Sequence, residues 1–422
     1  MKTTTTIAAL ALAFLGSTLA ACSHGGGSGG SGDSPSGAVI YPAAVDAPPG
    51  GTVRFAASLA GAGDIAWSVV EPNGGSIDAY GAYTAPQSEG TFHVIAASPA
   101  AGLQTSATVT VRVGAPAGVG LSSTPPSDGT TPWAPAASDA SWVNVRSFGA
   151  VGDGVTDDTA AFRNAAATGK QLFVPAPPVA YNLTGVVHLQ SSIYGDGSMP
   201  LIRMIGSDGD PDQGVTKNIL LVSNYQGPGL VVNGLHLDGG WTGGTNGEWS
   251  HGVNVTQSSN VTIQNNLIEN AYGDDVFVGA FASPMSDNVL VQSNTLKNPR
   301  RCNVAVNGAT RVTIRNNSVV KTGTYVSAID LEPDPLGFQY VRGVTIDGNT
   351  FAVVSQDWGA GAISLNNPDG NPSSGDVSIT NNRGTWTPAF TYMDVVSGSG
   401  GIVGVVPHLA WYNVTASNNV QN

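Results

Sequence analysis

The chain has 422 residues, of which 56 are glycine and only 11% are charged, and its net charge is −13. Abundant glycine and sparse charge are typical of an all-β secreted protein rather than a helical one. The negative charge disfavours a general nucleic-acid binder. The length allows two domains or one large solenoid. Of the two cysteines, Cys22 is a candidate for lipidation and Cys302 is expected to be a buried small hydrophobe, so no disulfide is expected.

The first 22 residues have the features of a targeting segment. Lys2 provides a positive start, and the apolar run over 7–19 is too short to cross a bilayer by itself. The run ends in Leu-Ala-Ala-Cys, which resembles the lipobox of bacterial lipoproteins and implies cleavage before Cys22 and acylation of that residue. Ser23 then implies, by the same resemblance, a lipid anchor in the outer membrane of a Gram-negative bacterium, facing either the periplasm or the cell surface. An ordinary signal peptide with a coincidental cysteine is the alternative.

Three segments of different composition follow the targeting segment. Residues 23–37 are rich in Gly and Ser and predict a flexible tether. Residues 38–114 contain short alternating strands separated by Pro and Gly turns, which predicts a small β-sandwich. Trp67 together with Gly-Ala-Tyr-Thr-Ala-Pro at 81–86 resembles bacterial immunoglobulin-like domains. Residues 115–140 are rich in Pro, Ser and Ala and predict a linker.

A short strand pattern recurs five times in the second half of the chain. Its copies begin at Val261, Val289, Val312, Val344 and Val377, which are 28, 23, 32 and 33 residues apart, and each copy ends in Asn or Gly. A second short strand lies between successive copies. Such a repeat without helices predicts a β-solenoid, whose turns stack roughly 4.8 Å apart so that equivalent residues form rows. Asn and Gly suit the corners because both tolerate a left-handed backbone.

The segment before these repeats carries the most specific motifs. Residues 142–162 read Trp-Val-Asn-Val-Arg-Ser-Phe-Gly-Ala-Val-Gly-Asp-Gly-Val-Thr-Asp-Asp-Thr-Ala-Ala-Phe, followed by Leu-Phe-Val-Pro at 172–175 and Ile-Tyr-Gly-Asp-Gly at 193–197. They strongly resemble the opening of the pectate-lyase-like superfamily, which includes rhamnogalacturonases, polygalacturonases and polysaccharide epimerases. With the repeats, the resemblance covers about 142–420. It implies a right-handed parallel β-helix over 141–422, so the predicted fold class is all-β.

The acidic residues Asp153, Asp157 and Asp158 in this opening are interpreted as structural rather than catalytic. Thr156 or Asp157 is expected to cap a helix over 158–167. That helix would close the N-terminal end of the solenoid and cover its open edge.

Charged residues interrupt the apolar strands between the repeats on four neighbouring turns. They are His251, Asp274, Asp275, Arg300, Arg301, Asp330 and Glu332. These strands otherwise carry small and apolar residues, so the charges predict an active site on the outer surface of the strands. Trp241 and Trp249 in a glycine-rich loop, and Tyr272, are candidate contacts to sugar rings. The alternative for the two tryptophans is that they pack the loop against the solenoid.

Paired carboxylates are the usual acid and base of glycoside cleavage. If Val276 and Val278 point inward, alternation places Asp275 outward and leaves Asp274 on the other side of the strand. Asp330 lies two turns further on, so the backbones of Asp275 and Asp330 are expected to differ by roughly 10 Å along the axis. That separation is compatible with an inverting glycosidase.

Two local motifs connect these residues to known solenoid enzymes. Gly-Asp-Asp at 273–275 resembles the paired-aspartate strand of polygalacturonase-type glycosidases, but the Asn-Thr-Asp, Gly-His-Gly and Arg-x-Lys motifs of that family are missing. These departures put simple pectin hydrolysis in doubt. Ala-Ile-Asp-Leu-Glu-Pro at 328–333 resembles a motif of related bacterial solenoid proteins.

The segment 297–321 contains six basic residues and no acidic ones, which predicts an anionic sugar as the partner, bound by Arg300 and Arg301. The predicted function is therefore binding and glycoside hydrolysis of an acidic polysaccharide by a lipid-anchored protein. A polysaccharide lyase or uronate epimerase that uses Arg301 and His251 stays open, and so does a non-catalytic binding or matrix protein. Cys and His spacing predicts no metal cofactor, although calcium bound through Asp274, Asp275 and Asp330 stays open. The oligomeric state is not predicted.

Overall fold

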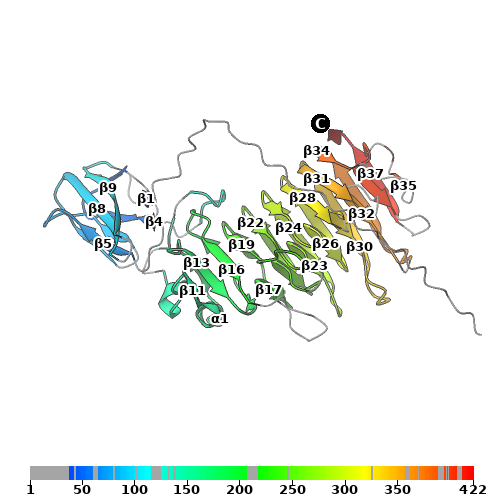
Figure 1. The fold of residues 1–422 in the computed structure, drawn as a ribbon, viewed down its shortest axis with the longest axis horizontal. Helices are drawn as coiled ribbons and strands as arrows, with labels where there is room; N and C mark the ends of the chain where they lie inside the picture. Colours follow the sequence, from blue (N-terminus) through cyan, green and yellow to red (C-terminus); the bar gives the residue numbers. More distant parts are fainter. Residues whose placement is uncertain are drawn as a thin grey trace, which may run out of the picture. The chain divides into compact units, whose positions relative to one another are not determined.

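The computed structural model describes most of the chain after the tether (Figure 1). The described residues are 38–41, 44–59, 65–78, 81–99, 102–115, 125–131, 133–135, 139–206, 217–244, 247–324, 327–356, 362–368, 370–387, 394–395, 397, 399–405 and 411–422. The predicted signal segment with Cys22 and the predicted tether lie outside them.

The first strands form small sheets that fit the predicted immunoglobulin-like sandwich. Alternating side chains of its long strands are buried, as expected for strands with one face on a core. One described sheet contains β2 (Ala44–Ala47), β9 (Leu103–Val111), β8 (Gly90–Ser98) and β5 (Ala66–Val69). The others contain β3 (Thr52–Arg54), β7 (Ala82–Thr84) and β6 (Ser76–Ile77), and β1 (Ala38–Tyr41) with β4 (Ala56–Leu59).

The rest of the chain winds through three parallel sheets, which confirms the predicted right-handed parallel β-helix (Figure 1). The first sheet contains β10 (Trp142–Asn144), β12 (Gln171–Val174), β15 (Ile193–Gly195), β18 (Leu230–Asn233), β21 (Ser259–Gln264), β24 (Ser286–Gln292), β27 (Ala309–Arg315), β30 (Val341–Asp347), β33 (Gly375–Thr380) and β37 (Tyr412–Ser417). The second sheet contains β11 (Asp153–Asp157), β13 (Ala180–Leu183), β16 (Leu201–Met204), β19 (His236–Asp238), β22 (Leu267–Glu269), β25 (Thr295–Lys297), β28 (Ser318–Thr324), β31 (Thr350–Gln356), β34 (Arg383–Trp386) and β38 (Val420–Gln421). The third sheet contains β14 (Val187–His188), β17 (Leu220–Ser223), β20 (Val253–Thr256), β23 (Val276–Gly279), β26 (Val304–Asn307), β29 (Ile329–Leu331), β32 (Ile363–Leu365), β36 (Val403–Val405) and β35 (Asp394–Val395), the last of them antiparallel.

The five sequence repeats are the strands of the first sheet from β21 to β33, paired in register. Val261 pairs with Val289 and Val289 with Val312, so the valines and isoleucines of successive turns form continuous buried rows. A core built of such rows needs only apolar residues of similar size at each level.

Asparagines stabilise the corner between the first and second sheets. Asn266, Asn294, Asn317, Asn349 and Asn382 form a buried ladder in which each Nδ2 donates to the Oδ1 of the next turn at 2.9–3.0 Å. The residue before each of them has positive φ, between 54° and 65°. The expected left-handed corner conformation is therefore confirmed at Asn265, Asn316, Gly348 and Asn381, and Ser293 adopts it as well.

A short helix, α1 (Thr159–Ala166), packs on the first turns of the solenoid (Figure 1). The expected cap is wrong, because Asp158 is the N-cap residue. Its carboxylate accepts the backbone N–H groups of Val151 and Gly152 instead of capping the helix. No helix in the described part of the chain is long and apolar enough to cross a membrane.

Part of the segment expected to be a linker packs on the first sheet. Trp133 is buried against Trp142, Phe173 and Tyr194, and its indole N–H donates to Gly195 O at 2.7 Å. The packing of the Trp133 ring and the hydrogen bond of its indole N–H together fix residues 133–135 to the solenoid.

Candidate active site

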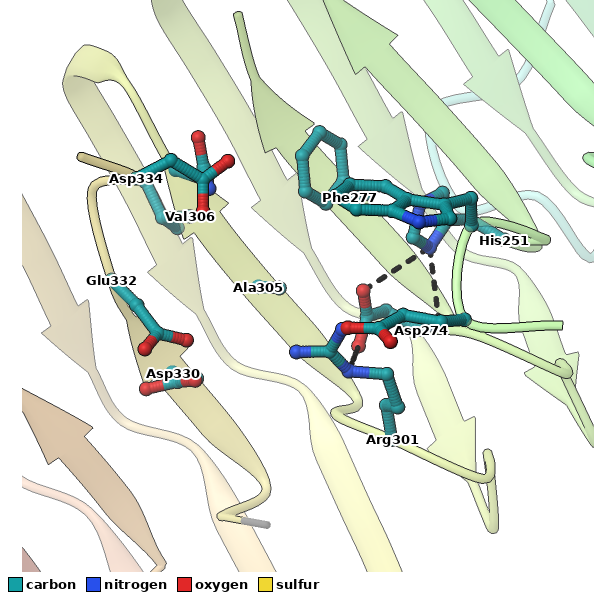
Figure 2. A pocket seen from close by; sticks show the side chains of 12 residues that line it. His251, Asp274, Phe277, Arg301, Ala305, Val306, Asp330, Glu332 and Asp334 are labelled. Atoms are coloured by element: carbon teal, nitrogen blue, oxygen red, sulfur yellow. Dashed lines mark hydrogen bonds and ion pairs between the residues drawn. The ribbon is translucent and has the colours of Figure 1, made fainter. Parts of the chain in front are cut away.

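A pocket of about 250 Å³ opens on the outer face of the third sheet. Phe277, Ala305 and Asp330 are paired across β23, β26 and β29, so their side chains form one outward row. The small Ala305 between two larger neighbours leaves space above the middle strand, as Figure 2 shows. The pocket is lined by Glu248, Trp249, His251, Asp274, Phe277, Arg301, Ala305, Val306, Asn307, Asp330, Glu332 and Asp334.

The outward orientation expected for Asp275 is wrong, because Asp274 lines the pocket in its place. β23 begins only at Val276, and the chain turns the corner of the solenoid just before it. Asp275 is fully buried. A Cβ added at Gly252, just before β20, would lie 2.6 Å from Ile268 Cγ2 in the core, so this corner position also faces inward. Strand alternation therefore does not extend backward through the corner.

Asp274 is held by groups from three turns. His251 Nδ1 lies 3.1 Å from Asp274 Oδ2, and the Cys302 N–H donates to Asp274 Oδ1 at 2.8 Å. Arg301 Nε lies 4.0 Å from the same Oδ1 (Figure 2). Burial opposes ionisation of Asp274, but the hydrogen bond from His251 and the charge of Arg301 outweigh it and lower the pKa of this carboxyl. Asp274 is thus kept ionised.

Asp330 and Glu332 lie across the pocket from Asp274, on and just after β29 (Figure 2). Burial and the neighbouring charge of Glu332 raise the pKa of Asp330 to about 7, although Ser364 Oγ donates to Asp330 Oδ1 at 2.5 Å. Burial also raises the pKa of Glu332, which accepts a hydrogen bond from Asn366. Near neutral pH Asp274 is therefore ionised, whereas the facing Asp330, with a pKa of about 7, is partly protonated.

The basic band at 297–321 does not form a free cationic surface. Arg301 pairs with Glu248, and Arg300 Nε donates to Tyr272 O at 2.7 Å without lining the pocket. The other four members also have protein partners: Lys297 with Glu269, Arg311 with Asp287, Arg315 with Gln292, and Lys321 with Arg301 O. The observation that predicted an anionic sugar is thus explained by contacts within the protein.

Aromatic side chains form one wall of the pocket. His251 stacks on Phe277 with ring centroids 4.7 Å apart, and Phe277 stacks on Phe281 at 5.9 Å. Trp249 meets Phe281 edge to face at 5.5 Å. We call Trp249 and Phe277, which line the pocket, together with Phe281, which packs on both of them beside the lining, the aromatic wall. Of the other two predicted sugar contacts, neither Trp241 nor Tyr272 lines the pocket.

The three carboxylates considered for calcium are not brought together, because Asp275 points inward while Asp274 and Asp330 face the pocket. Within the described residues, no group of three or more His, Cys, Asp or Glu side chains could hold a metal ion. Calcium binding at this site stays a prediction. Cys302 is buried, as predicted, but it packs with Phe277 and Ala305 of the outward row rather than with the inward valines of β26.

Sequence reasoning missed several lining residues. Asp334 follows Glu332 by two positions, so alternation along this segment could have identified it. Glu248 lies in a loop, and no pattern in the sequence indicates that it reaches the pocket.

The arrangement suits proton transfer on both sides of a bound group. A carboxyl that keeps its proton near neutral pH can act as a general acid, and an ionised carboxylate can act as a general base. Asp274 and Asp330 belong to turns two apart, so their backbones differ by roughly 10 Å along the axis.

Comparison with known proteins gives one family and several distant folds. Residues 142–350 match the family described as rhamnogalacturonase A/epimerase, pectate lyase-like. Among solved structures, the chain resembles the pre-mature gene product 12 of bacteriophage phi29 (16% identity, TM-score 0.43). The likeness covers 66% of this chain but only 32% of the phage protein. It also resembles the Streptococcus pneumoniae surface protein and adhesin PfbA (18% identity, TM-score 0.44, 66% and 85% of the two chains). A third likeness is to the A-module of the Azotobacter vinelandii mannuronan C-5 epimerase AlgE6 (18% identity, TM-score 0.32, 66% and 99%). No curated protein matches the chain.

Proposed function

Because residues 142–350 belong to the rhamnogalacturonase A/epimerase, pectate lyase-like family, we propose that this protein binds a polysaccharide in the pocket of the third sheet and hydrolyses it. One observation carries the proposal. Two carboxyl groups with opposite pKa shifts, Asp274 lowered and Asp330 raised to about 7, lie on either side of the space above Ala305. When the surroundings of two carboxyl groups raise one pKa and lower the other, the first group can act as the acid and the second as the base.

In this proposal Asp330 donates its proton to the glycosidic oxygen as the bond to the anomeric carbon breaks. Asp274 accepts a proton from the water that attacks that carbon from the opposite side. His251 and Arg301 hold Asp274 in place and ionised. The separation of roughly 10 Å along the axis fits the 6.5–9.5 Å carboxyl spacing of inverting enzymes better than the roughly 5 Å of retaining ones.

A uronate lyase or epimerase is the second candidate, and the imidazole of His251 favours it. Among the described residues His251 Nε2 has no hydrogen-bond partner although it is buried at the pocket. His251 Nδ1 lies 3.1 Å from both the Asp274 N–H and Asp274 Oδ2. In the tautomer whose Nδ1 donates to Oδ2, Nε2 carries no proton and could accept the one next to a uronate carboxylate, with Arg301 nearby to neutralise charge. The expectation of an acidic substrate is part of this candidate.

A panel of acidic and neutral polysaccharides tests the two candidates together. Reducing ends and the absorbance of unsaturated products are measured with the wild-type protein and with Asp330→Asn. New reducing ends without the unsaturated signal, lost in the variant, support hydrolysis. An unsaturated product establishes a lyase and overturns hydrolysis. Neither signal with any polysaccharide also overturns it and leaves epimerisation or binding alone.

A further inference from the structure

We propose that the pocket selects a pyranose that carries no carboxylate, and that this sugar stacks its apolar face on the aromatic wall. The inference rests on the proposed function of the pocket and narrows its substrate class. It departs from the acidic polysaccharide that the basic band predicted.

The aromatic wall is exposed and held in place. Phe281 has 45% of its surface exposed although it borders a polar pocket. The residue before it, Ala280, is fixed on both sides: its N–H donates to Asn307 O at 3.0 Å, and its carbonyl accepts from Gln339. Phe277, which is only 4% exposed, supports Phe281 from behind as a parallel ring. A fixed aromatic surface binds the C–H face of a sugar ring with little loss of side-chain entropy.

The charge of the lining disfavours a sugar carboxylate. The lining contains five carboxyl groups, Glu248, Asp274, Asp330, Glu332 and Asp334, and one guanidinium, that of Arg301. Arg301 already forms ion pairs with Glu248 and Asp274. Its positive charge is therefore largely neutralised and would attract a uronate only weakly. Like charges brought close together in a partly buried pocket repel strongly.

The hydrogen-bonding groups of the lining also favour an uncharged sugar. Sugar hydroxyls both donate and accept hydrogen bonds, so the edge of the ring can pair with an ionised carboxylate or with a carboxyl that keeps its proton. An uncharged pyranose therefore matches both surfaces of the pocket, with its C–H face on Phe281 and its hydroxyl edge toward Glu332 and Asp334. Pockets that combine an apolar wall with a few placed polar groups are typical small-ligand sites.

The test compares a polyuronate with its carboxyl-reduced form, which keeps the rings and linkages and loses only the charge. Neutral glucans and galactans extend the panel. Binding to the full-length protein is measured by affinity electrophoresis and calorimetry, without reliance on turnover. We expect a carboxyl-reduced or neutral glycan to bind and the polyuronate to bind at least roughly tenfold more weakly.

Two variants and a control locate the effect. Phe281→Ala should weaken binding of the neutral glycan roughly tenfold. Val179→Ala, which removes an equally exposed apolar side chain (46%) at a position outside the pocket lining, should leave it unchanged. Asp334→Asn should reduce the discrimination against the polyuronate.

The outcomes separate this inference from the hydrolase proposal. Equal or tighter binding of the polyuronate overturns the inference, and so does Phe281→Ala that binds like the wild type. Binding of a neutral glycan without cleavage overturns hydrolysis but supports the inference. Failure to bind any glycan overturns both.

Discussion

At the scale of single residues, two neighbours of Asp330 shift the pKa of its carboxyl group in opposite directions. The charge of Glu332 raises the pKa of Asp330, whereas the hydrogen bond from Ser364 lowers it. As a general acid, Asp330 must be protonated, so activity should fall as pH rises through about 7. The lowered pKa of Asp274 keeps the base ionised down to acidic pH.

Substituting the two neighbours should move this alkaline limit in opposite directions. Glu332→Gln removes a like charge, lowers the pKa of Asp330 and moves the limit to lower pH. Ser364→Ala removes a hydrogen bond to the ionised form, raises that pKa and moves the limit to higher pH. The measurement is kcat/KM against pH for the wild type and both variants. Shifts in the same direction, or none, would show that Asp330 is not the acid.

Which of two adjacent aspartates faces the pocket could not be predicted from the sequence. The valines of β23 are inward as expected, but alternation assumes a continuous strand. The corner before Val276 turns Asp275 inward as well. The presence of acidic groups on this turn was predictable, because nothing in an apolar strand needs them. Their orientation depends on the geometry of the bend.

At the scale of structural elements, a lysine inside the solenoid connects the second sheet to the third. Lys321 on β28 is fully buried, and its ammonium donates to Arg301 O at the corner that carries Arg301 and the Cys302 N–H. Burial lowers the pKa of Lys321 and raises the pKa of Asp275 well above its ordinary value. Asn303 bridges the same region by donating to Asp275 Oδ2 at 2.9 Å.

Removing this lysine should destabilise the fold and loosen the corner. Lys321→Met leaves the partly buried Arg301 carbonyl without its hydrogen-bond donor, and we expect a loss of roughly 1–3 kcal/mol in the free energy of unfolding. Adding Asp275→Asn should change stability little further, because burial raises the pKa of Asp275 well above its ordinary value and the substitution therefore removes little charge. The measurement is denaturant unfolding of the single and double variants.

The control for this prediction is Lys297→Met. Lys297 forms an exposed pair with Glu269 at 3.0 Å, so its loss should change stability by less than about 1 kcal/mol. Equal effects at the two lysines would contradict a special role for Lys321.

Elements with a regular period were the predictable ones. The five repeats and their Asn or Gly corners predicted the strands of the first sheet, because each turn must bury the same apolar rows. Trp133 lies in a Pro- and Ser-rich stretch, where composition predicts a linker. Its packing against Trp142 and Tyr194 depends on one side chain that no periodicity reveals.

At the scale of the whole molecule, we propose that the protein is anchored in the outer membrane through an acylated Cys22. The described residues include no part of this segment, so the proposal rests on the lipobox-like sequence. Several acyl chains give stable attachment. Cys22→Ala should move the protein from the membrane fraction to the soluble fraction on cell fractionation. Retention of the variant in the membrane fraction would contradict a lipid anchor.

The substrate could not be predicted at this scale, although the fold could. The composition and the opening motif favoured an all-β solenoid of a known superfamily. The basic band, however, was counted along the chain, whereas ion pairs form across turns. Arg311, for example, is 24 residues from its partner Asp287. Charge along the chain is therefore a poor guide to charge at a pocket of a solenoid.

The most direct test of the proposed mechanism compares Asp274→Asn with Asp275→Asn on the polysaccharide that the panel identifies. The two substitutions are chemically identical and one peptide bond apart, and thermal unfolding checks that both variants fold. We predict that Asp274→Asn lowers kcat/KM by roughly 10²- to 10⁴-fold, as expected for loss of a general base, while Asp275→Asn stays within roughly tenfold of the wild type because its side chain points into the core. A folded Asp274→Asn variant with full activity, or a selective loss in Asp275→Asn, would contradict the assignment of the site.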